Sequence, residues 1–381
     1  MAPIKYRDWR LMVGLLSLAC GGNEPTQPEP PVSPTPEFEV SQFAAPEVCA
    51  NCHPNHFQEW QGSMHAYAFV DPVFFAMHDR GQQDTGGELD QFCVGCHSPI
   101  GSRSGETPPF FNREALSPIS KRGVQCDMCH TITKINQTSN ADFELSPGDV
   151  KHGSLADPAA NDFHQSVFNS LYDRSEFCGT CHEVVNGLGA KIEETFSEWV
   201  NASLAGMSFD CQDCHMPTYA GQAAVDGPQR EKLHRHHFVG ADVPLVDFPN
   251  ADEQRRLVEE LLKNSAALSV SLPESVATGD TVRIEVRIDN TKTGHSLPSG
   301  VAVERQMWIA ITARDENGNI IYESGQLDEN GDLMDHHSLT HPNGDPDLVI
   351  FRQTLYDENG SEVLFFWQAK SVKNNLIPVF D

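Results

Sequence analysis

Ten of the eleven cysteines in this 381-residue chain belong to one repeated pattern, in which two cysteines separated by two residues are followed directly by a histidine. Two thiols at this spacing can add to the two vinyl groups of a haem, and the adjacent imidazole can then bind its iron. A disulfide framework does not need a histidine after every second cysteine, and zinc sites have no rule for that residue. The pattern therefore predicts five covalent haems of the c type. Its cysteines are Cys49, Cys52, Cys93, Cys96, Cys126, Cys129, Cys178, Cys181, Cys211 and Cys214, and its predicted proximal ligands are His53, His97, His130, His182 and His215.

The spacing of the five motifs points to electron transfer. They begin at positions 49, 93, 126, 178 and 211, intervals short enough to force neighbouring haems close together. Apolar residues make up only 39% of the chain, so flat apolar porphyrins are expected to fill much of the interior of a pentahaem domain over residues 45–245. We expect this domain to be helical, loop-rich and packed around its haems.

Each iron needs a second axial ligand or keeps an open position. Twelve histidines lie outside the motifs, and this surplus favours irons with two histidine ligands, although several must be ordinary surface or core residues. Residues 55–69 predict one helix, interrupted only by Gly62. His65 lies about 18 Å along that helix from His53, so the two cannot flank one iron, and His65 is expected to serve a different haem.

Weaker signals single out other distal candidates. His164 lies on a predicted helix fourteen residues before Cys178, whereas His152 lies in a looser stretch. His78 fits a distal ligand and a helix C-terminal cap equally well. His295, in NTKTGHSLPSG, fits a ligand of the last haem and a polar turn residue equally well. The segment LHRHHFVG offers three histidines of which one is expected to be used: His234, His236 and His237.

The first twenty residues predict an export signal. A basic start precedes the short apolar core of residues 11–19, which is too short for a permanent membrane span. Cys20 then follows a small residue, as at a bacterial lipoprotein processing site, although Ser17 stands where leucine is usual. Lipidation at Cys20 competes with ordinary cleavage near Ala19. Residues 21–44 predict a proline-rich tether.

Six segments resemble the multihaem cytochrome superfamily that includes the nitrifiers' tetrahaem cytochrome c and hydroxylamine oxidoreductase. They are CHPNHFQEWQGSMH, GVQCDMCH, FCGTCH, EETFSEW, CQDCHMP and HRHHFVG, in the family's order between residues 45 and 240. The resemblance implies mostly bis-histidine haems in parallel and perpendicular pairs, and an electron-transfer role. It also implies distal ligation by His65, His152, His164 and one histidine of the 234–237 group, for which we take His237. On the same ground we expect His152 to cover the haem of the first motif.

The sequence also departs from that family. Five motifs match neither the four nor the eight of the best-known members. No motif ends in lysine, whereas the motif that holds the catalytic haem of pentahaem nitrite reductases does. No cross-linking tyrosine of the hydroxylamine oxidoreductase kind can be placed.

The last third of the chain follows a different pattern. An amphipathic stretch at residues 251–264 predicts a linking helix within residues 246–265. Residues 266–381 alternate with period two and predict an all-β, immunoglobulin-like sandwich, whose end at LIPVFD reads as unfinished. The segment DENG occurs at 315, 328 and 357. We expect turns at these positions in preference to calcium-binding loops. No cysteine follows Cys214, which excludes a thiolate copper site.

The formal charge of −28 argues against nucleic-acid binding and favours redox partners with basic docking surfaces. Together these features predict an electron carrier in the periplasm or at the outer membrane or cell surface, held there by lipid. The alternative is an oxidoreductase acting on a small nitrogen or sulfur compound at one open haem. A third class is a structural role, in which the sandwich docks a partner or polymerises the chain.

Overall fold

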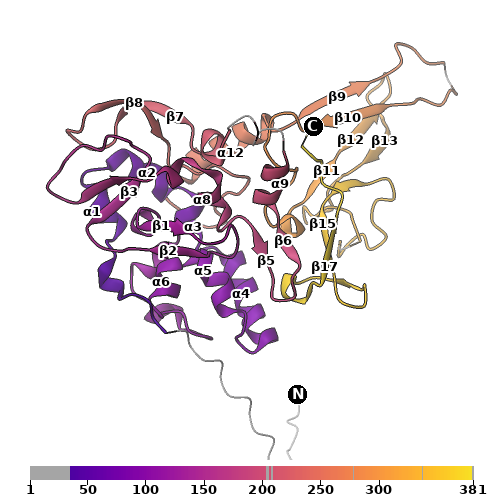
Figure 1. Ribbon diagram of the computed structural model, residues 1–381. Helices are drawn as coiled ribbons and strands as arrows, with labels where there is room; N and C mark the ends of the chain where they lie inside the picture. The colour runs from indigo at the N-terminus through magenta and orange to yellow at the C-terminus, as the bar shows by residue number, and fades with distance from the viewer. Residues whose placement is uncertain (1–34, 203–205, 207–208, 278, 337, 380–381) are drawn as a thin grey trace, which may run out of the picture.

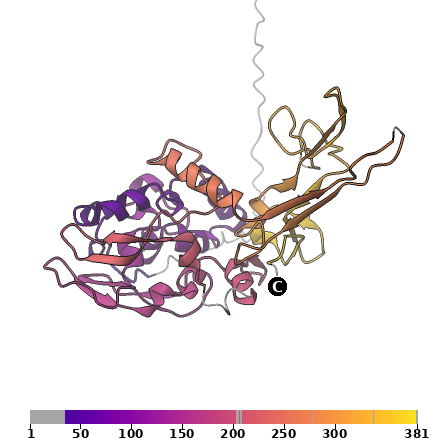
Figure 2. The ribbon, with the colours of Figure 1, turned by 90° about the horizontal axis from the view of Figure 1, so that it is seen from above.

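The computed structural model describes residues 35–202, 206, 209–277, 279–336 and 338–379. The predicted export signal, Cys20 and most of the predicted tether therefore lie outside the described residues. A helical, loop-rich part, coloured indigo to magenta, lies beside a sheet-rich part, coloured orange to yellow (Figure 1). Seen from above, the two parts are separate lobes with a long helix near their junction (Figure 2). Within the described ranges, no helix is long and apolar enough to cross a membrane.

Short helices carry the five cysteine motifs. Cysteines three residues apart, and a histidine one residue later, share one face of a single helical turn, so one turn presents all three side chains together. Among the described helices of this part, only α4 exceeds eight residues. The helices are α1 (Pro46–Ala50), α2 (Pro54–Gln61), α3 (Met64–Tyr67), α4 (Pro72–Thr85), α5 (Asp90–His97), α6 (Pro99–Arg103), α7 (Cys126–Cys129), α8 (Ser175–Gly179), α9 (Thr195–Asn201) and α11 (Cys211–His215).

Four two-stranded sheets are found among the described residues of the first part. β3 and β4 run parallel, and the other three pairs are antiparallel hairpins. Isolated pairs of this size are not independently stable, so they depend on packing against the rest of the lobe. The strands are β1 (Ile132–Ile135), β2 (Phe143–Leu145), β3 (Val150–Gly153), β4 (Gln165–Phe168), β5 (Val184–Val185), β6 (Lys191–Glu193), β7 (Thr218–Gln222) and β8 (Gln229–His234).

Three local predictions differ from the structure. The helix expected over residues 55–69 is two helices, because Gly62 ends α2 and the Ser63 side chain accepts the Ala66 N–H at the start of α3. His164 precedes strand β4, not a helix, because β4 pairs with β3 along its whole length. His78 lies in the middle of α4, so it is not a C-terminal cap; Gly86 ends that helix with a left-handed backbone (φ 65°).

The last third contains α12 (Ala251–Lys263), as expected, and then strands. They pair as three antiparallel ribbons, β9–β10, β11–β14 and β12–β13, and one three-stranded sheet, β16–β15–β17. Among the described strands, two continuous sheets facing each other are not formed. The strands are β9 (Ala267–Ser271), β10 (Glu285–Asp289), β11 (Met307–Ile309), β12 (Ile311–Arg314), β13 (Ile320–Ser324), β14 (Val349–Phe351), β15 (Gln353–Tyr356), β16 (Glu362–Val363) and β17 (Ser371–Asn374).

The two outer DENG segments form hairpin turns. In the first, the Asp315 side chain accepts the backbone N–H groups of Asn317 and Asn319, and Gly318 has a φ of 83°. The third segment repeats this arrangement around Asp357. These Asp carboxylates are thus occupied by backbone donors, as the turn interpretation expects.

A small hydrophobic cluster joins the two parts. Ile192 of β6 packs with Leu355 of β15 and Ala369, all almost fully buried. The Asn186 side chain also donates hydrogen bonds to the carbonyls of Phe366 and Ala369, both at 2.7 Å. Apolar burial and satisfied polar groups therefore hold the sheet-rich part against the motif-bearing part.

Candidate haem sites

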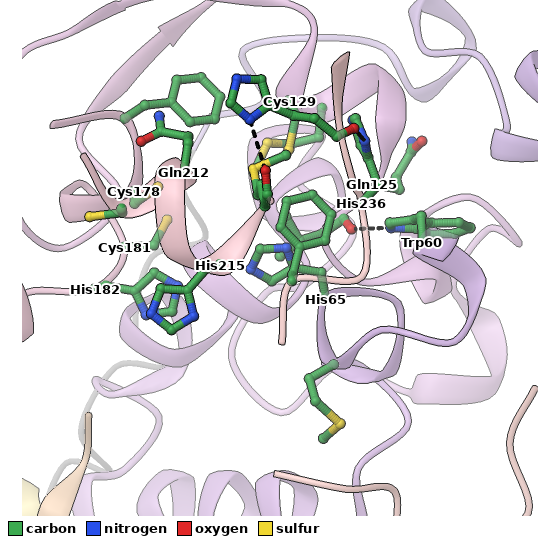
Figure 3. Close-up of a pocket in the computed structure, with 18 of the residues that line it drawn as sticks. Trp60, His65, Gln125, Cys129, Cys178, Cys181, His182, Gln212, His215 and His236 are labelled. Carbon is green, nitrogen blue, oxygen red and sulfur yellow. Dashed lines mark hydrogen bonds between the residues drawn. The ribbon is translucent and has the colours of Figure 1, made fainter. Parts of the chain in front are cut away.

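All five motifs line one large cavity. It has a volume of about 2240 Å³, and both cysteines and the histidine of every motif lie on its wall. Protein interiors are otherwise close-packed, and pockets for small ligands hold about 300–1,000 Å³. The cavity therefore has the size of a site for several large groups. Figure 3 shows His65, His182, His215 and His236 around one part of it, together with Cys129, Cys178 and Cys181.

Each motif histidine is oriented by a hydrogen bond from its Nδ1. The acceptor is a backbone carbonyl in four motifs and a carboxylate in the fourth. This bond fixes the tautomer and leaves Nε2 available, which is the usual arrangement of a metal-binding histidine. The pairs are His53 with Ala223 (2.7 Å), His97 with Ala68 (2.9 Å), His130 with His152 (2.6 Å), His182 with Glu193 (3.2 Å) and His215 with Val239 (2.6 Å).

Four of these imidazoles have a second histidine ring at a nearly constant distance. Two imidazoles on opposite sides of one metal have centroids about 6 Å apart, because each metal–nitrogen bond is about 2 Å long and each centroid lies about 1 Å behind its nitrogen. The observed separations match that value. The pairs are His53 with His164 (6.3 Å), His130 with His236 (6.4 Å), His182 with His65 (6.2 Å) and His215 with His295 (6.2 Å).

Distance alone does not assign a pair. His56 also lies 6.3 Å from His53, but it comes one turn later on α2 and projects from the same side of the helix. It cannot approach an iron from the side opposite His53. His56 instead accepts a hydrogen bond from the Tyr219 hydroxyl (3.1 Å) and packs on His236 at 4.6 Å. The sequence had given no reason to single out His56.

Comparison with known families agrees with this geometry. Residues 48–131, which span the first three motifs, match the family model described as cytochrome c554 and c-prime. This match supports a c-type cytochrome, and with it covalently bound haem c and electron transfer in this region. Comparisons with curated proteins and with solved structures gave no match.

The side chains of the cytochrome fit this cofactor. Burial lowers the pKa of His65 to about 3, so its imidazole is neutral at pH 7 and able to bind a metal. Its Nδ1 is buried without a hydrogen-bond partner, while its ring packs on Phe238 at 4.4 Å. A neutral, largely apolar environment of this kind suits the face of a haem.

Two sequence-based ligand choices differ from the observed geometry. His164, and not His152, has its ring beside that of His53; the backbone carbonyl of His152 instead accepts the Nδ1–H of His130. His236, and not His237, lies beside His130, since His236 points into the cavity. Strand β8 ends at His234 and the chain bends at His236, and in this arrangement His236 lines the cavity whereas His237 does not. His234 donates from Nδ1 to the Met216 carbonyl (2.9 Å).

The second motif has distinct surroundings. Phe74 stacks on the imidazole of His97 at 4.1 Å with the planes within 10°. Phe74 belongs to a buried aromatic cluster with Phe69 and Phe111. His78 packs at the edge of this cluster, where the side-chain nitrogen of Gln82 lies 2.8 Å from its Nδ1.

Sulfur contacts show which motifs are neighbours. The thiols of Cys49 and Cys126 lie within hydrogen-bonding reach of each other, which links the first and third motifs. Cys96 likewise reaches Cys181, and Cys178 reaches Cys211, which links the fourth motif to the second and the fifth. The fourth motif therefore lies between the second and the fifth, and the first motif lies beside the third.

Proposed function

We propose that this cytochrome binds five haems and carries electrons between partners outside the cytoplasm. The observation that carries the proposal is that five motif imidazoles, each oriented through Nδ1, line one continuous cavity. Haem iron supplies reversible one-electron oxidation and reduction. The chain's own side chains hold the axial positions, exclude water from them and keep the five sites close enough for electrons to pass from one to the next.

The proposed distal ligands follow from the ring separations. His164 serves the first motif, His236 the third, His65 the fourth and His295 the fifth. His295 belongs to the C-terminal third, and its Nδ1 donates to the Ser296 carbonyl (2.9 Å), which leaves Nε2 available. The fifth haem would then be bound between the two parts of the chain.

The proposal includes the location and partners of the protein. The basic start, the short apolar core and Cys20 support export and lipid attachment at the outer membrane or cell surface. The net charge of −28 supports docking of redox proteins with basic surfaces. The period-two pattern supports an immunoglobulin-like character for the sheet-rich part, which would serve as a docking module.

A second candidate function has one observation in its favour. Histidine rings lie beside four motif histidines at 6.2–6.4 Å, whereas the ring that stacks on His97 is the phenyl group of Phe74. An open position at the second haem would allow a small nitrogen or sulfur compound to bind and react. The protein would then be an oxidoreductase.

Stepwise reduction of the purified, matured protein tests the proposal. It is expected to take up five electrons per chain, with visible and electron paramagnetic resonance spectra dominated by low-spin iron, because imidazole pairs are strong axial ligands. Uptake of fewer than five electrons would contradict the proposal. A high-spin haem that binds nitrite or hydroxylamine and turns it over would favour the second candidate.

A further inference from the structure

The fourth motif differs from the other four in what orients its histidine. The Nδ1–H of His182 donates to the carboxylate of Glu193 at 3.2 Å, whereas the other motif histidines donate to backbone carbonyls. The Glu193 residue is only 7% exposed, so little water screens its charge. A carbonyl offers a partial charge to the imidazole, but this carboxylate offers a full one.

The structure holds this carboxylate in place. Glu193 ends β6, where its backbone pairs with Val184, and Thr195 donates a hydrogen bond to its Oε1 (3.4 Å). The Thr195 hydroxyl also contacts the Ser299 hydroxyl (2.9 Å) and accepts the Gly300 N–H (3.0 Å). Residues from both parts of the chain therefore position Glu193 against His182.

Two cations near Glu193 each pair with another carboxylate, and the first of them, Arg305, pairs with Asp242. The ammonium group of Lys191 lies 3.4 Å from Glu183 and 3.5 Å from Glu194. The carboxylate of Glu193 therefore acts on the imidazole of His182 through their hydrogen bond. The position of Glu193 and its negative charge therefore both favour positive charge on the His182 imidazole.

We propose that Glu193 is a positioning residue that lowers the reduction potential of the haem at the fourth motif. A carboxylate that accepts the Nδ1–H makes the imidazole a stronger electron donor, and a stronger donor stabilises ferric over ferrous iron. The inference rests on the proposed electron-transfer function. Because the fourth motif contacts the second and the fifth through its sulfurs, this haem would set the energy of the step by which electrons pass between those two sites.

Glu193→Gln in the matured protein tests the inference by redox titration. The amide keeps the size and the acceptor oxygen but removes the charge. One of the five haems is expected to shift about tenfold toward the reduced form, a rise of about 59 mV for one electron. Smaller rises are expected at the second and fifth motifs, because the charge of Glu193 also acts on His97 and His295. The haem with the largest shift should be the one whose spin state changes in His65→Ala, since His65 lies beside His182.

Glu183→Gln is the matched control. Glu183 is equally buried and directly follows His182, but its carboxylate accepts hydrogen bonds from Ser197 and not from the imidazole. Equal shifts in the two variants, or no shift in Glu193→Gln, would overturn the inference. If Glu193→Gln does not fold, Thr195→Val keeps the charge but loosens the carboxylate, and a smaller rise in the same haem is expected; its absence would also overturn the inference. Fewer than five haems in the unmodified protein would instead refute the proposed function.

Discussion

A chain produced without haem attachment is expected to lack the fold described above and to unfold without a cooperative transition. At about 24 cal/mol for each Å³ of unfilled cavity, a void of about 2240 Å³ would cost on the order of 50 kcal/mol if it were enclosed. Domains are stable by only about 5–15 kcal/mol, so the side chains alone cannot hold the cavity open. Folding and haem attachment should therefore be coupled, as in small metal-dependent domains.

Circular dichroism and calorimetry of the haem-free and matured chains would measure this coupling. The matured chain is the control, and it should show a cooperative thermal transition and an ordered near-ultraviolet spectrum. A haem-free chain with the same transition and spectrum would contradict the account. Its cavity would then have to be closed by a packing that differs from the one observed.

Replacement of His65 by alanine is expected to turn one low-spin haem high-spin, and that haem should be the one held by Cys178 and Cys181. His65 lies on α3, directly after the break at Gly62, and its ring lies 6.2 Å from that of His182. The loss of one of two axial imidazoles leaves the iron with a single strong ligand. Electron paramagnetic resonance would record the change.

The affected haem can be assigned with a variant that lacks the fourth attachment site, Cys178→Ala with Cys181→Ala. In that background, His65→Ala should add no further high-spin signal. His152→Ala is the matched control, because the contact of His152 with His130 is made through its backbone carbonyl. A ligand loss at the first motif in His65→Ala would refute the assignment.

The sequence predicts much of this fold because its strongest signals are local. A CxxCH motif needs only one helical turn, so all five could be recognised from spacing alone. The amphipathic pattern of α12 and the period-two strands are local in the same sense. The match over residues 48–131 supports the interpretation of the first three motifs as haem attachment sites.

The pairing of histidines could not be predicted in this way, because it depends on segments that are far apart in the chain. His53 and His164 are 111 positions apart in the chain. A helix was expected around His164, but His164 directly precedes strand β4, which pairs in parallel with β3. The choice between His236 and His237 depends on how the chain bends after strand β8. No sequence motif marks Glu193, and the antiparallel pairing of β5 with β6 brings it to His182.

The number of covalent haems is the central claim, and denaturing mass spectrometry tests it most directly. After denaturation only covalently attached groups remain, so each complete motif should add the mass of one haem. The account predicts five haem additions on the matured chain and no disulfide among the ten motif cysteines. Four additions or fewer on fully matured protein would contradict it.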